Sequence, residues 1–327
     1  MPKVSIVLPN YNYDKYLDQR IKSLLDQTYK DFELVIVDDA STDCSLEIIE
    51  KYNFDSRIKT KFYSENSGLP YKRWNDGASF ANGEYILFAG ADDSCKPTLI
   101  EELVNRLDEK KTIGLAYSQS IEIDSFGKFI RSLKITTDDL DRNKWSQDYT
   151  ASGREELKYL IVKNTIPNAS CVLLRRDTFE EVGKFDVQLR LVADWLLYSK
   201  MLLVSDIAFI SEPLNYWRIH RKTVRSKSQQ TGKHILEELQ VVDWISKQVD
   251  IPSSFLDLSY NRIVNRWVNS TVRLMLTKPG MVKEQTQSVF TAANEVVPDL
   301  SKRLSKRVIK DISTAGLLTL RERGLRR

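Results

Sequence analysis

The sequence predicts an α/β protein: a mixed, mostly parallel sheet with helices on both faces, followed by a C-terminal α-helical domain. Two patterns predict this fold class. In the first half, short apolar runs alternate with segments whose apolar residues recur every three or four positions, which indicates repeated strand–helix units. From about residue 232 onward, long helical stripes replace the alternation. We therefore expect an α/β domain over residues 1–225 and a helical domain over residues 226–327.

Each element follows from its local pattern. Continuous apolar runs predict buried strands, stripes at helical spacing predict helices, and Asp43 is a plausible N-cap of the second helix. The polar stretch 132–153 predicts a mobile loop. The expected strands are 4–8, 32–37, 58–63, 85–88, 169–174 and 207–210, with a hairpin formed by 121–123 and 129–130. The expected helices are 16–27, 69–80 and 194–204, one after Asp43, and one that opens at Pro97.

Composition excludes several classes of protein. The 327 residues carry a net charge of +4, but residues 301–327 hold nine basic and two acidic side chains, so the body is close to neutral. A neutral body argues against nucleic acid as a partner. No apolar run approaches the roughly 20 residues of a membrane span. Three scattered cysteines and a start that leads straight into a strand favour a cytoplasmic protein without a signal peptide.

Two adjacent carboxylates, Asp92 and Asp93, follow the predicted strand 85–88. Adjacent carboxylates repel each other unless a cation lies between them. A divalent metal, Mn²⁺ or Mg²⁺, takes oxygen ligands and shares them with substrate phosphates. The alternative is that Asp93 or Ser94 caps the next helix.

Three polar clusters follow predicted strands of the first half: residues 9–12, 38–43 and 90–93. Parallel strands bring their carboxyl ends to one edge of the sheet, where ligands bind. The ring of Tyr11, the carboxylates of Asp38 and Asp39 and a metal pair suit a nucleoside diphosphate: the ring stacks on the base, a carboxylate accepts from its N–H groups, and the metal neutralises phosphate.

These residues also resemble a known family. The segments VSIVLPNYN (residues 4–12) and LVIVDDASTD (34–43) resemble the opening of the family 2 glycosyltransferases, which have the GT-A (Rossmann-like) fold. The resemblance covers about residues 3–225. It continues through NSG (66–68), RWNDG (73–77), ANGEYI (81–86), GKFD (183–186), ADW (193–195) and PLNYWRIH (213–220).

The resemblance implies roles position by position. Asp194 would be the general base, Asp92 the metal-binding aspartate, and His220 a further ligand of metal or diphosphate, with Asp93 assisting. Gly90 departs from the family pattern, which has an aspartate there, and this weakens the metal assignment. The nucleotide-binding set comprises Pro9, Asn10, Tyr11, Asp38, Asp39, Arg73, Ala91 and Arg218.

Structural alternatives stand beside these roles. Asp194 could instead cap the helix that it opens, although apolar neighbours would suit a base by raising its pKa. His220 could be an ordinary half-buried histidine beside Tyr216 and Trp217. Trp145 could stack on sugar rings or anchor the core. The segment 168–170 could line the acceptor side of the site.

The C-terminal segment 301–327 combines apolar residues at helical spacing with lysines and arginines. Such a basic amphipathic helix binds an anionic membrane surface, on the inner face of the cell membrane, or packs with its basic face in solvent. The helical domain is also a candidate surface for a homo-oligomer.

The leading hypothesis is an inverting, metal-dependent glycosyltransferase. Its partners would be a nucleoside-diphosphate sugar, with UDP favoured, and a glycan or lipid-linked glycan acceptor of the bacterial cell-surface polysaccharide type. The alternative is a catalytically silent module that binds nucleotide sugars or glycans. A nucleotidyltransferase is disfavoured because residues 9–12 supply no glycine-rich phosphate loop.

Overall fold

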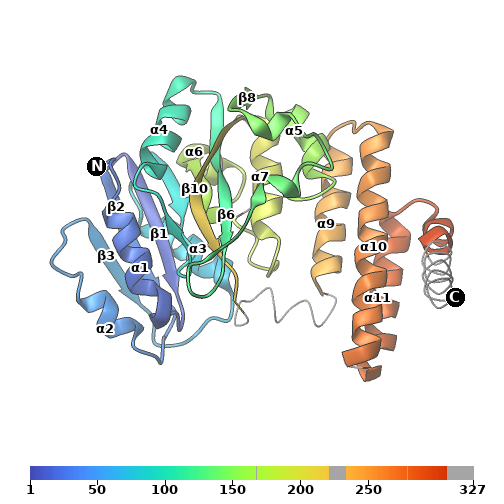
Figure 1. Cartoon of the computed structure of the whole chain (residues 1–327), viewed down its shortest axis with the longest axis horizontal. Coiled ribbons are helices and arrows are strands. Elements are labelled where there is room, and N and C mark those ends of the chain that lie inside the picture. The colour runs from blue at the N-terminus through green and yellow to red at the C-terminus, as the bar shows by residue number, and fades with distance from the viewer. Residues whose placement is uncertain (167, 221–232, 278, 308–327) are drawn as a thin grey trace, which may run out of the picture. The chain divides into compact units, whose positions relative to one another are not determined.

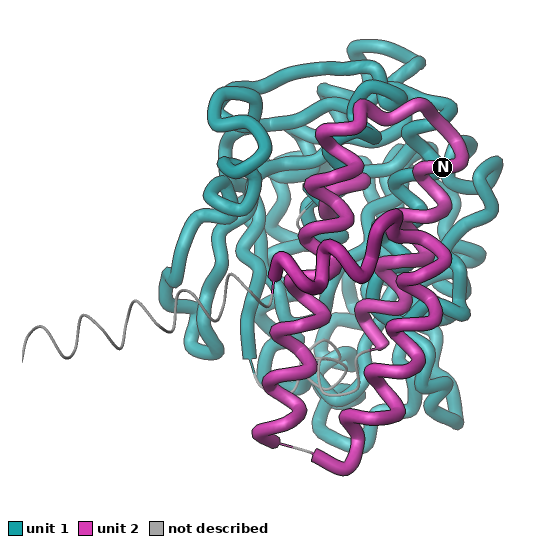
Figure 2. Tube along the Cα trace, turned by 90° about the vertical axis from the view of Figure 1, so that its right-hand side faces the viewer, with its two compact units in different colours: residues 1–160, 164–223 teal, residues 161–163, 224–327 magenta. Residues whose placement is uncertain are grey.

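The computed structural model describes residues 1–166, 168–220, 233–277 and 279–307 (Figure 1). The chain divides into two compact units. One comprises residues 1–160 and 164–223, and the other comprises residues 161–163 and 224–327 (Figure 2). The first unit contains the sheet, and the second is helical in its described part.

The described residues form one ten-stranded sheet with the order β3-β2-β1-β4-β9-β6-β10-β5, in which β7 also pairs with β6 and β8 with β10. Strands β1 to β4 are parallel, β6 is parallel to β10, and β9 is antiparallel to both β4 and β6. The predicted mixed, mostly parallel sheet is therefore confirmed. The strands are β1 (Val4–Asn10), β2 (Phe32–Asp38), β3 (Ile58–Phe62), β4 (Tyr85–Phe88), β5 (Ser94–Cys95), β6 (Ile113–Ile123), β7 (Phe129–Ser132), β8 (Tyr149–Ala151), β9 (Val172–Arg175) and β10 (Asp206–Arg218).

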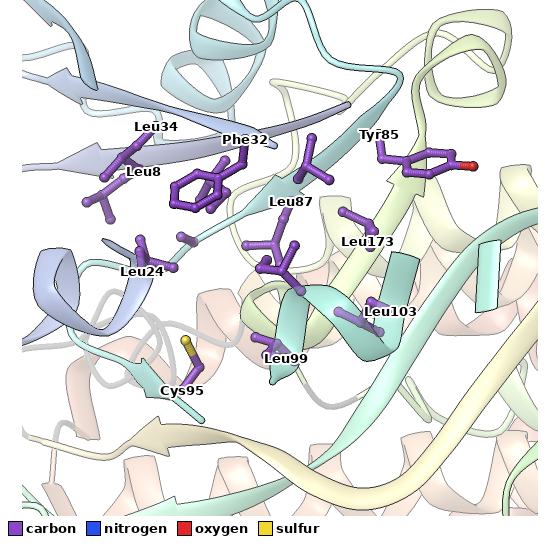
Figure 3. Packing of buried hydrophobic residues seen from close by; sticks show 14 of the residues in the cluster. Leu8, Leu24, Phe32, Leu34, Tyr85, Leu87, Cys95, Leu99, Leu103 and Leu173 are labelled. Atoms are coloured by element: carbon purple, nitrogen blue, oxygen red, sulfur yellow. The ribbon is translucent and has the colours of Figure 1, made fainter. Parts of the chain in front are cut away.

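One face of the sheet is covered by α1 (Asp14–Leu25), α2 (Ser45–Glu50) and α4 (Leu99–Glu109). Their buried apolar side chains pack on the alternate side chains of β1, β2 and β4 that point to this side. Figure 3 shows Leu24 of α1 and Leu99 of α4 within this cluster, beside Leu8, Leu34 and Leu87.

The opposite face carries α3 (Pro70–Phe80) and α6 (Arg176–Glu181), while α5 (Gly153–Leu160) packs against α7 (Ala193–Val204). Helix α3 approaches the sheet closely at Gly77, where an added Cβ would lie 2.3 Å from Cγ1 of Val7. Phe88 of β4 faces the same side and lies 5.4 Å from the rings of Trp74 and Phe179. Helices therefore cover both faces, as predicted.

Several local predictions were wrong. The stretch 132–153, expected as a mobile loop, contains η1 (Leu133–Thr136), η2 (Lys144–Ser146) and β8, which pairs with β10. Helix α4 begins at Leu99 and follows the short strand β5, so neither Asp93 nor Ser94 caps it. Helix α2 begins at Ser45 after an N-cap at Cys44, although the Asp43 carboxylate accepts a hydrogen bond from Ser45 N at 3.0 Å.

The second unit contains α9 (Lys233–Gln248), α10 (Ser253–Thr277), η4 (Pro279–Met281) and α11 (Val282–Val296). Its core is formed by Ile235 and Val242 of α9, Ile263 and Trp267 of α10 and Val289 of α11. Of the predicted basic segment, residues 308–327 lie outside the described residues. In the described part, Arg303 donates to the Asp257 carboxylate of α10 at 2.5 Å. None of the helices in the described ranges has the length and apolar character needed to span a bilayer.

Candidate functional site

The parallel order β2-β1-β4 brings the three predicted polar clusters to one edge of the sheet. Asn10, the last residue of β1, lies opposite Asp38, the last residue of β2. β4 ends at Phe88, immediately before the segment 90–93. The topology therefore confirms that these clusters share the edge where α/β proteins bind ligands.

Asp38 braces the loop that follows β2. Its carboxylate accepts from Asn10 Nδ2 at 2.7 Å, from Ser41 N at 2.8 Å and from Ser41 Oγ at 2.7 Å. The side chain is almost fully buried, so it does not face the solvent-accessible edge. Asp38 therefore stabilises this loop, instead of contacting a bound base as predicted.

Asp39 anchors the segment that leads to α3. Its backbone N–H donates to Asn10 O at 2.9 Å, and its carboxylate accepts from Ser67 N, at 3.0 and 3.1 Å, and from Ser67 Oγ at 2.9 Å. Arg73 of α3 completes the set through its Nε, and its guanidinium lies 3.4 Å from the ring centroid of Tyr63. The structure thus joins Asp39 and Arg73, both predicted to bind the nucleotide, in one buried unit.

Tyr11 presents the accessible aromatic ring of this edge, because 43% of the residue is exposed. It follows β1 directly and precedes Asn12, whose backbone is left-handed with φ of 59°. Pro9 is half-buried within β1. The side chain of Ala91 packs in the hydrophobic cluster of the first face, so Ala91 can offer a ligand its backbone alone.

Asp92 and His220 meet beyond the end of β4. His220 Nε2 lies 2.9 Å from Asp92 Oδ2. The imidazole packs against two rings of the α1 region, with centroid distances of 5.9 Å to Tyr13 and 5.2 Å to Tyr16. The predicted pairing of Asp92 with His220, which lie 128 residues apart in sequence, is therefore present in the structure.

Asp93 points away from this pair into the protein. Its Oδ1 accepts from the backbone N–H of Arg218 at 2.9 Å, and its Oδ2 accepts from Ser170 Oγ at 2.6 Å and from Asn168 Nδ2 at 3.3 Å. Burial and the neighbouring Asp92 carboxylate raise the pKa of Asp93 to about 7. Both oxygens already bind protein donors, which corrects the prediction that Asp93 is a metal ligand. Instead, it ties β4, β9 and β10 together.

Arg218 also departs from its predicted role near phosphates. Its Nε donates to Asp92 O at 2.7 Å, its Nη1 to Asp124 O at 3.0 Å and its Nη2 to Gln19 Oε1 at 2.8 Å. The side chain is 2% exposed, and its guanidinium lies 4.8 Å from the ring centroid of Tyr16. Each guanidinium nitrogen is thus engaged, and Arg218 supports the backbone that presents Asp92.

Arg20 of α1 was not singled out from the sequence. It is fully buried, and its guanidinium nitrogens have no hydrogen-bond partner among the described residues. Its positive charge opposes the rise in the pKa of Asp93, so it acts as an internal counter-charge. The spacing of Tyr13, Tyr16 and Arg20 on one helical face was the available signal.

Gly90 leaves little room for the acid that the family pattern places there. A Cβ at Gly90 would lie 3.1 Å from Asp93 Oδ2, 3.3 Å from Asp92 Oδ1 and 3.3 Å from Ser170 Oγ. The Gly90 N–H donates to Ser170 Oγ at 2.9 Å. The glycine therefore allows this turn to close tightly around the two carboxylates.

Asp194 lies in the first turn of α7, with Val192 as N-cap, so the alternative of an N-cap role is wrong. Its Oδ1 accepts from Trp195 N at 2.8 Å and from the Tyr71 hydroxyl at 3.4 Å. Tyr71 is held by Phe185, whose ring centroid lies 5.3 Å away. A half-buried carboxylate with a fixed orientation can accept a proton from a bound hydroxyl group.

The two features predicted to contact the acceptor sugar have other roles in the structure. Trp145 is buried and donates from Nε1 to the Tyr117 hydroxyl at 2.8 Å, so it anchors the core and does not stack on sugars. Asn168 and Ser170 instead bind Asp93. They hold the Asp93 carboxylate in place inside the protein.

Asp92 and His220 are the candidate metal ligands at this edge of the sheet. No group of three or more His, Cys, Asp or Glu side chains in the described part of the chain could hold a metal ion. Asp92 and His220 supply one oxygen and one nitrogen ligand. Mn²⁺ accepts both ligand types, and a shared diphosphate supplies further oxygens. The ligand types present therefore fit a divalent metal ion that takes its remaining ligands from elsewhere.

Comparison with known proteins identifies the class to which this fold and site belong. Residues 5–183, more than half of the chain, match the family described as "Glycosyl transferase family 2". The chain therefore belongs to glycosyl transferase family 2.

Two relatives and one solved structure illustrate the match. The chain is 31% identical to an uncharacterized glycosyltransferase of Nostoc sp. over 67% of this chain and 65% of that protein. It is 29% identical to glycosyltransferase GlyG of Streptococcus pneumoniae over 81% of this chain and 85% of that protein. The structure of Staphylococcus aureus TarS 1–349 with UDP-GlcNAc superposes with a TM-score of 0.67 at 20% identity, over 89% of this chain and 81% of that one, which shows a shared fold.

Proposed function

We propose that this chain transfers a sugar from a UDP-sugar to a hydroxyl group of a glycan or lipid-linked glycan, with inversion at the anomeric carbon. Family membership and the likeness to a structure solved with UDP-GlcNAc support the reaction class and the donor. The observation that carries the proposal is the Asp92–His220 pair, which lies at the same sheet edge as the exposed ring of Tyr11.

The donor would lie along this edge. The uracil ring stacks on Tyr11, where an aromatic face is accessible. Asp39, held by Arg73 and Ser67, would support the loop that faces the base from inside the protein. Because the site is already assembled from internal hydrogen bonds, little conformational entropy is lost on binding.

Asp92 and His220 are the residues that would hold a divalent cation beside the diphosphate. When bound, such an ion stabilises the negative charge that develops on the leaving diphosphate. Asp93, Arg218 and Ser170 fix the turn that carries Asp92, so its carboxylate is presented in one orientation.

Asp194 would act as the general base. The acceptor oxygen attacks the anomeric carbon, the bond between that carbon and the diphosphate breaks, and the acceptor proton passes to the Asp194 carboxylate. The hydrogen bonds from Trp195 N and Tyr71 to Oδ1 orient the carboxylate. Direct attack from the face opposite the leaving group inverts the configuration.

The experiment compares wild type with Asp194→Asn, using Asp186→Asn as matched control. Asp186 is another half-buried aspartate of the same unit, and its carboxylate accepts from Gln188 N at 2.9 Å. We expect Asp194→Asn to bind UDP normally but to lower the transfer rate by about 10²–10⁴-fold, while Asp186→Asn keeps its rate. Normal turnover by Asp194→Asn would exclude Asp194 as the base.

Gly90 favours one further candidate, a catalytically silent module that binds nucleotide sugars, because an acid of the family pattern is missing there. The same assay decides between the two. Release of UDP from a UDP-sugar by wild type, abolished by Asp92→Asn, supports the enzyme. Binding of UDP-sugar without any release of UDP supports the silent module.

A further inference from the structure

The hairpin formed by β6 and β7, together with η1, exposes four large apolar side chains. The exposed fractions are 88% for Phe126, 61% for Phe129, 46% for Ile130 and 54% for Ile135. We call these four residues the hairpin patch. Single exposed apolar residues are ordinary, but four within ten consecutive residues concentrate apolar area on one surface segment, as interaction sites do.

Basic side chains accompany the patch. Lys128 is exposed between Phe126 and Phe129, and Lys134 directly precedes Ile135. From α1, Lys15 Nζ approaches to 5.2 Å from the ring centroid of Phe126. Apolar side chains surrounded by lysines are the composition that binds the interface of an anionic bilayer.

Acidic groups near the patch are mostly engaged. The Asp124 carboxylate accepts the backbone N–H groups of Phe126 at 2.8 Å and of Lys128 at 2.9 Å. Glu122 is buried and paired with Arg131. Asp138 and Asp139 follow the patch along the chain. Within residues 124–135, the segment that carries the patch, Lys128, Arg131 and Lys134 stand against the single acidic side chain of Asp124.

Hydrogen bonds join the hairpin to the candidate site. Asp124 O accepts from Arg218 Nη1 at 3.0 Å, and Ile219 N donates to Ile123 O at 2.9 Å. The same guanidinium holds Asp92 O at 2.7 Å. The patch and the Asp92–His220 pair are thus connected through Arg218 and the end of β10.

We propose that the hairpin patch is an interfacial anchor that holds the chain on an anionic lipid surface, with its candidate active site close to that surface. The placement of the site rests on the proposed function, whereas lipid binding does not. An acceptor embedded in that surface through a lipid would meet the site without first leaving the bilayer.

A second copy of the chain is the less suitable occupant. A stable dimer buries about 800 Å² per partner through roughly 20–30 residues on each side. The patch offers four large apolar side chains, and β7, an edge strand, has four residues. Short edge strands are poor templates for pairing. The lysines would also repel their counterparts in an identical copy, whereas they attract anionic headgroups.

The test measures sedimentation of the full chain with phosphatidylcholine vesicles that do or do not contain phosphatidylglycerol. The variant Phe126→Ser/Phe129→Ser removes the aromatic half of the patch. Phe54→Ser is the matched control, because Phe54 is 85% exposed on another surface segment of the same unit. A second variant, Lys128→Glu, changes charge alone. Stabilisation by UDP shows whether each variant remains folded with an intact nucleotide site.

We expect wild type to bind the anionic vesicles, and the double variant to bind about tenfold more weakly, because two large apolar side chains no longer leave water. Lys128→Glu should weaken binding at low salt, with the difference fading at high salt. Phe54→Ser should bind as wild type does. UDP binding should be unchanged throughout, so failure to bind vesicles would leave the proposed function untouched.

Four results would overturn the proposal. The first is wild type that does not bind anionic vesicles, and the second is a double variant that binds them as tightly as wild type. The third is Phe54→Ser losing as much binding as the double variant. The fourth is an effect of the patch variants on a dimer in solution or on the KM for a soluble oligosaccharide, without vesicle binding, which would assign the patch to a second copy or to the acceptor.

Discussion

Replacing Arg218 by methionine separates the two roles considered for this arginine. A phosphate-binding arginine would leave stability unchanged and weaken UDP binding when it is replaced. The structure instead gives it a supporting role, since its three guanidinium nitrogens donate to Asp92 O, Asp124 O and Gln19 Oε1. Methionine retains much of the apolar stem but supplies none of these donors.

The size of the effect follows from these contacts. A hydrogen bond from a charged donor contributes about 1.5–3 kcal/mol, and a buried acceptor left unpaired costs about 1–3 kcal/mol. Release of a buried charge offsets part of the loss, as does water that reaches the carbonyl groups. We therefore expect Arg218→Met to lower the free energy of unfolding by about 3 kcal/mol, a large part of the roughly 5–15 kcal/mol of a typical domain.

The assay is urea unfolding, followed by calorimetric titration with UDP. Arg175→Met is the matched control, because Arg175 also donates to two backbone carbonyl groups, Ile113 O at 3.1 Å and Leu107 O at 2.9 Å, but does so away from Asp92. Both variants should be destabilised, and Arg218→Met alone should weaken metal-dependent UDP binding. A loss below about 1 kcal/mol for Arg218→Met, combined with weak UDP binding, would refute the supporting role.

Two further predictions concern the site turn and the packing of α3. For Asp93→Asn, the pKa of about 7 in the folded protein lies above the ordinary value of 3.8, so the folded wild type holds this proton more tightly. The contribution of Asp93 to the free energy of unfolding is therefore lost as the pH rises from about 4 to about 7. Measured by urea unfolding, the free energy of unfolding should fall less over this pH range in Asp93→Asn than in wild type; an equal fall in both would contradict the assignment. For Gly77→Ala, the new Cβ would lie 2.3 Å from Val7 Cγ1, so we expect a loss of about 1–3 kcal/mol from overpacking, and unaltered stability would show that α3 moves freely.

The sequence predicted correctly those elements whose pattern depends on neighbouring residues alone. β1, β2 and β4 are mostly apolar because both of their faces are covered, and each leads into one of the three polar clusters. The parallel topology then follows from the intervening helices and brings Asn10 beside Asp38. The edge that holds the site was therefore predictable before any side-chain contact was known.

Long-range partners account for what the sequence did not predict. β8 pairs with β10, which lies more than 50 residues further along the chain, so its own short polar segment resembles a loop. Trp145 is equally suited to a sugar or to the core until the Tyr117 hydroxyl accepts its N–H. The role of Arg218 likewise depends on carbonyl groups more than 90 residues away. Local periodicity carries no information about such partners.

The most direct test of the central claim is a titration of wild type and Asp92→Asn with UDP, with and without Mn²⁺, followed by thermal unfolding. At a ligand concentration about 100 times Kd, binding stabilises the fold by about 2.7 kcal/mol, which is readily measured. We predict this stabilisation for wild type with Mn²⁺, and its loss on removal of Mn²⁺ or in Asp92→Asn. Equal stabilisation by UDP in all these conditions, or none in any, would contradict a nucleotide site built on Asp92 and His220.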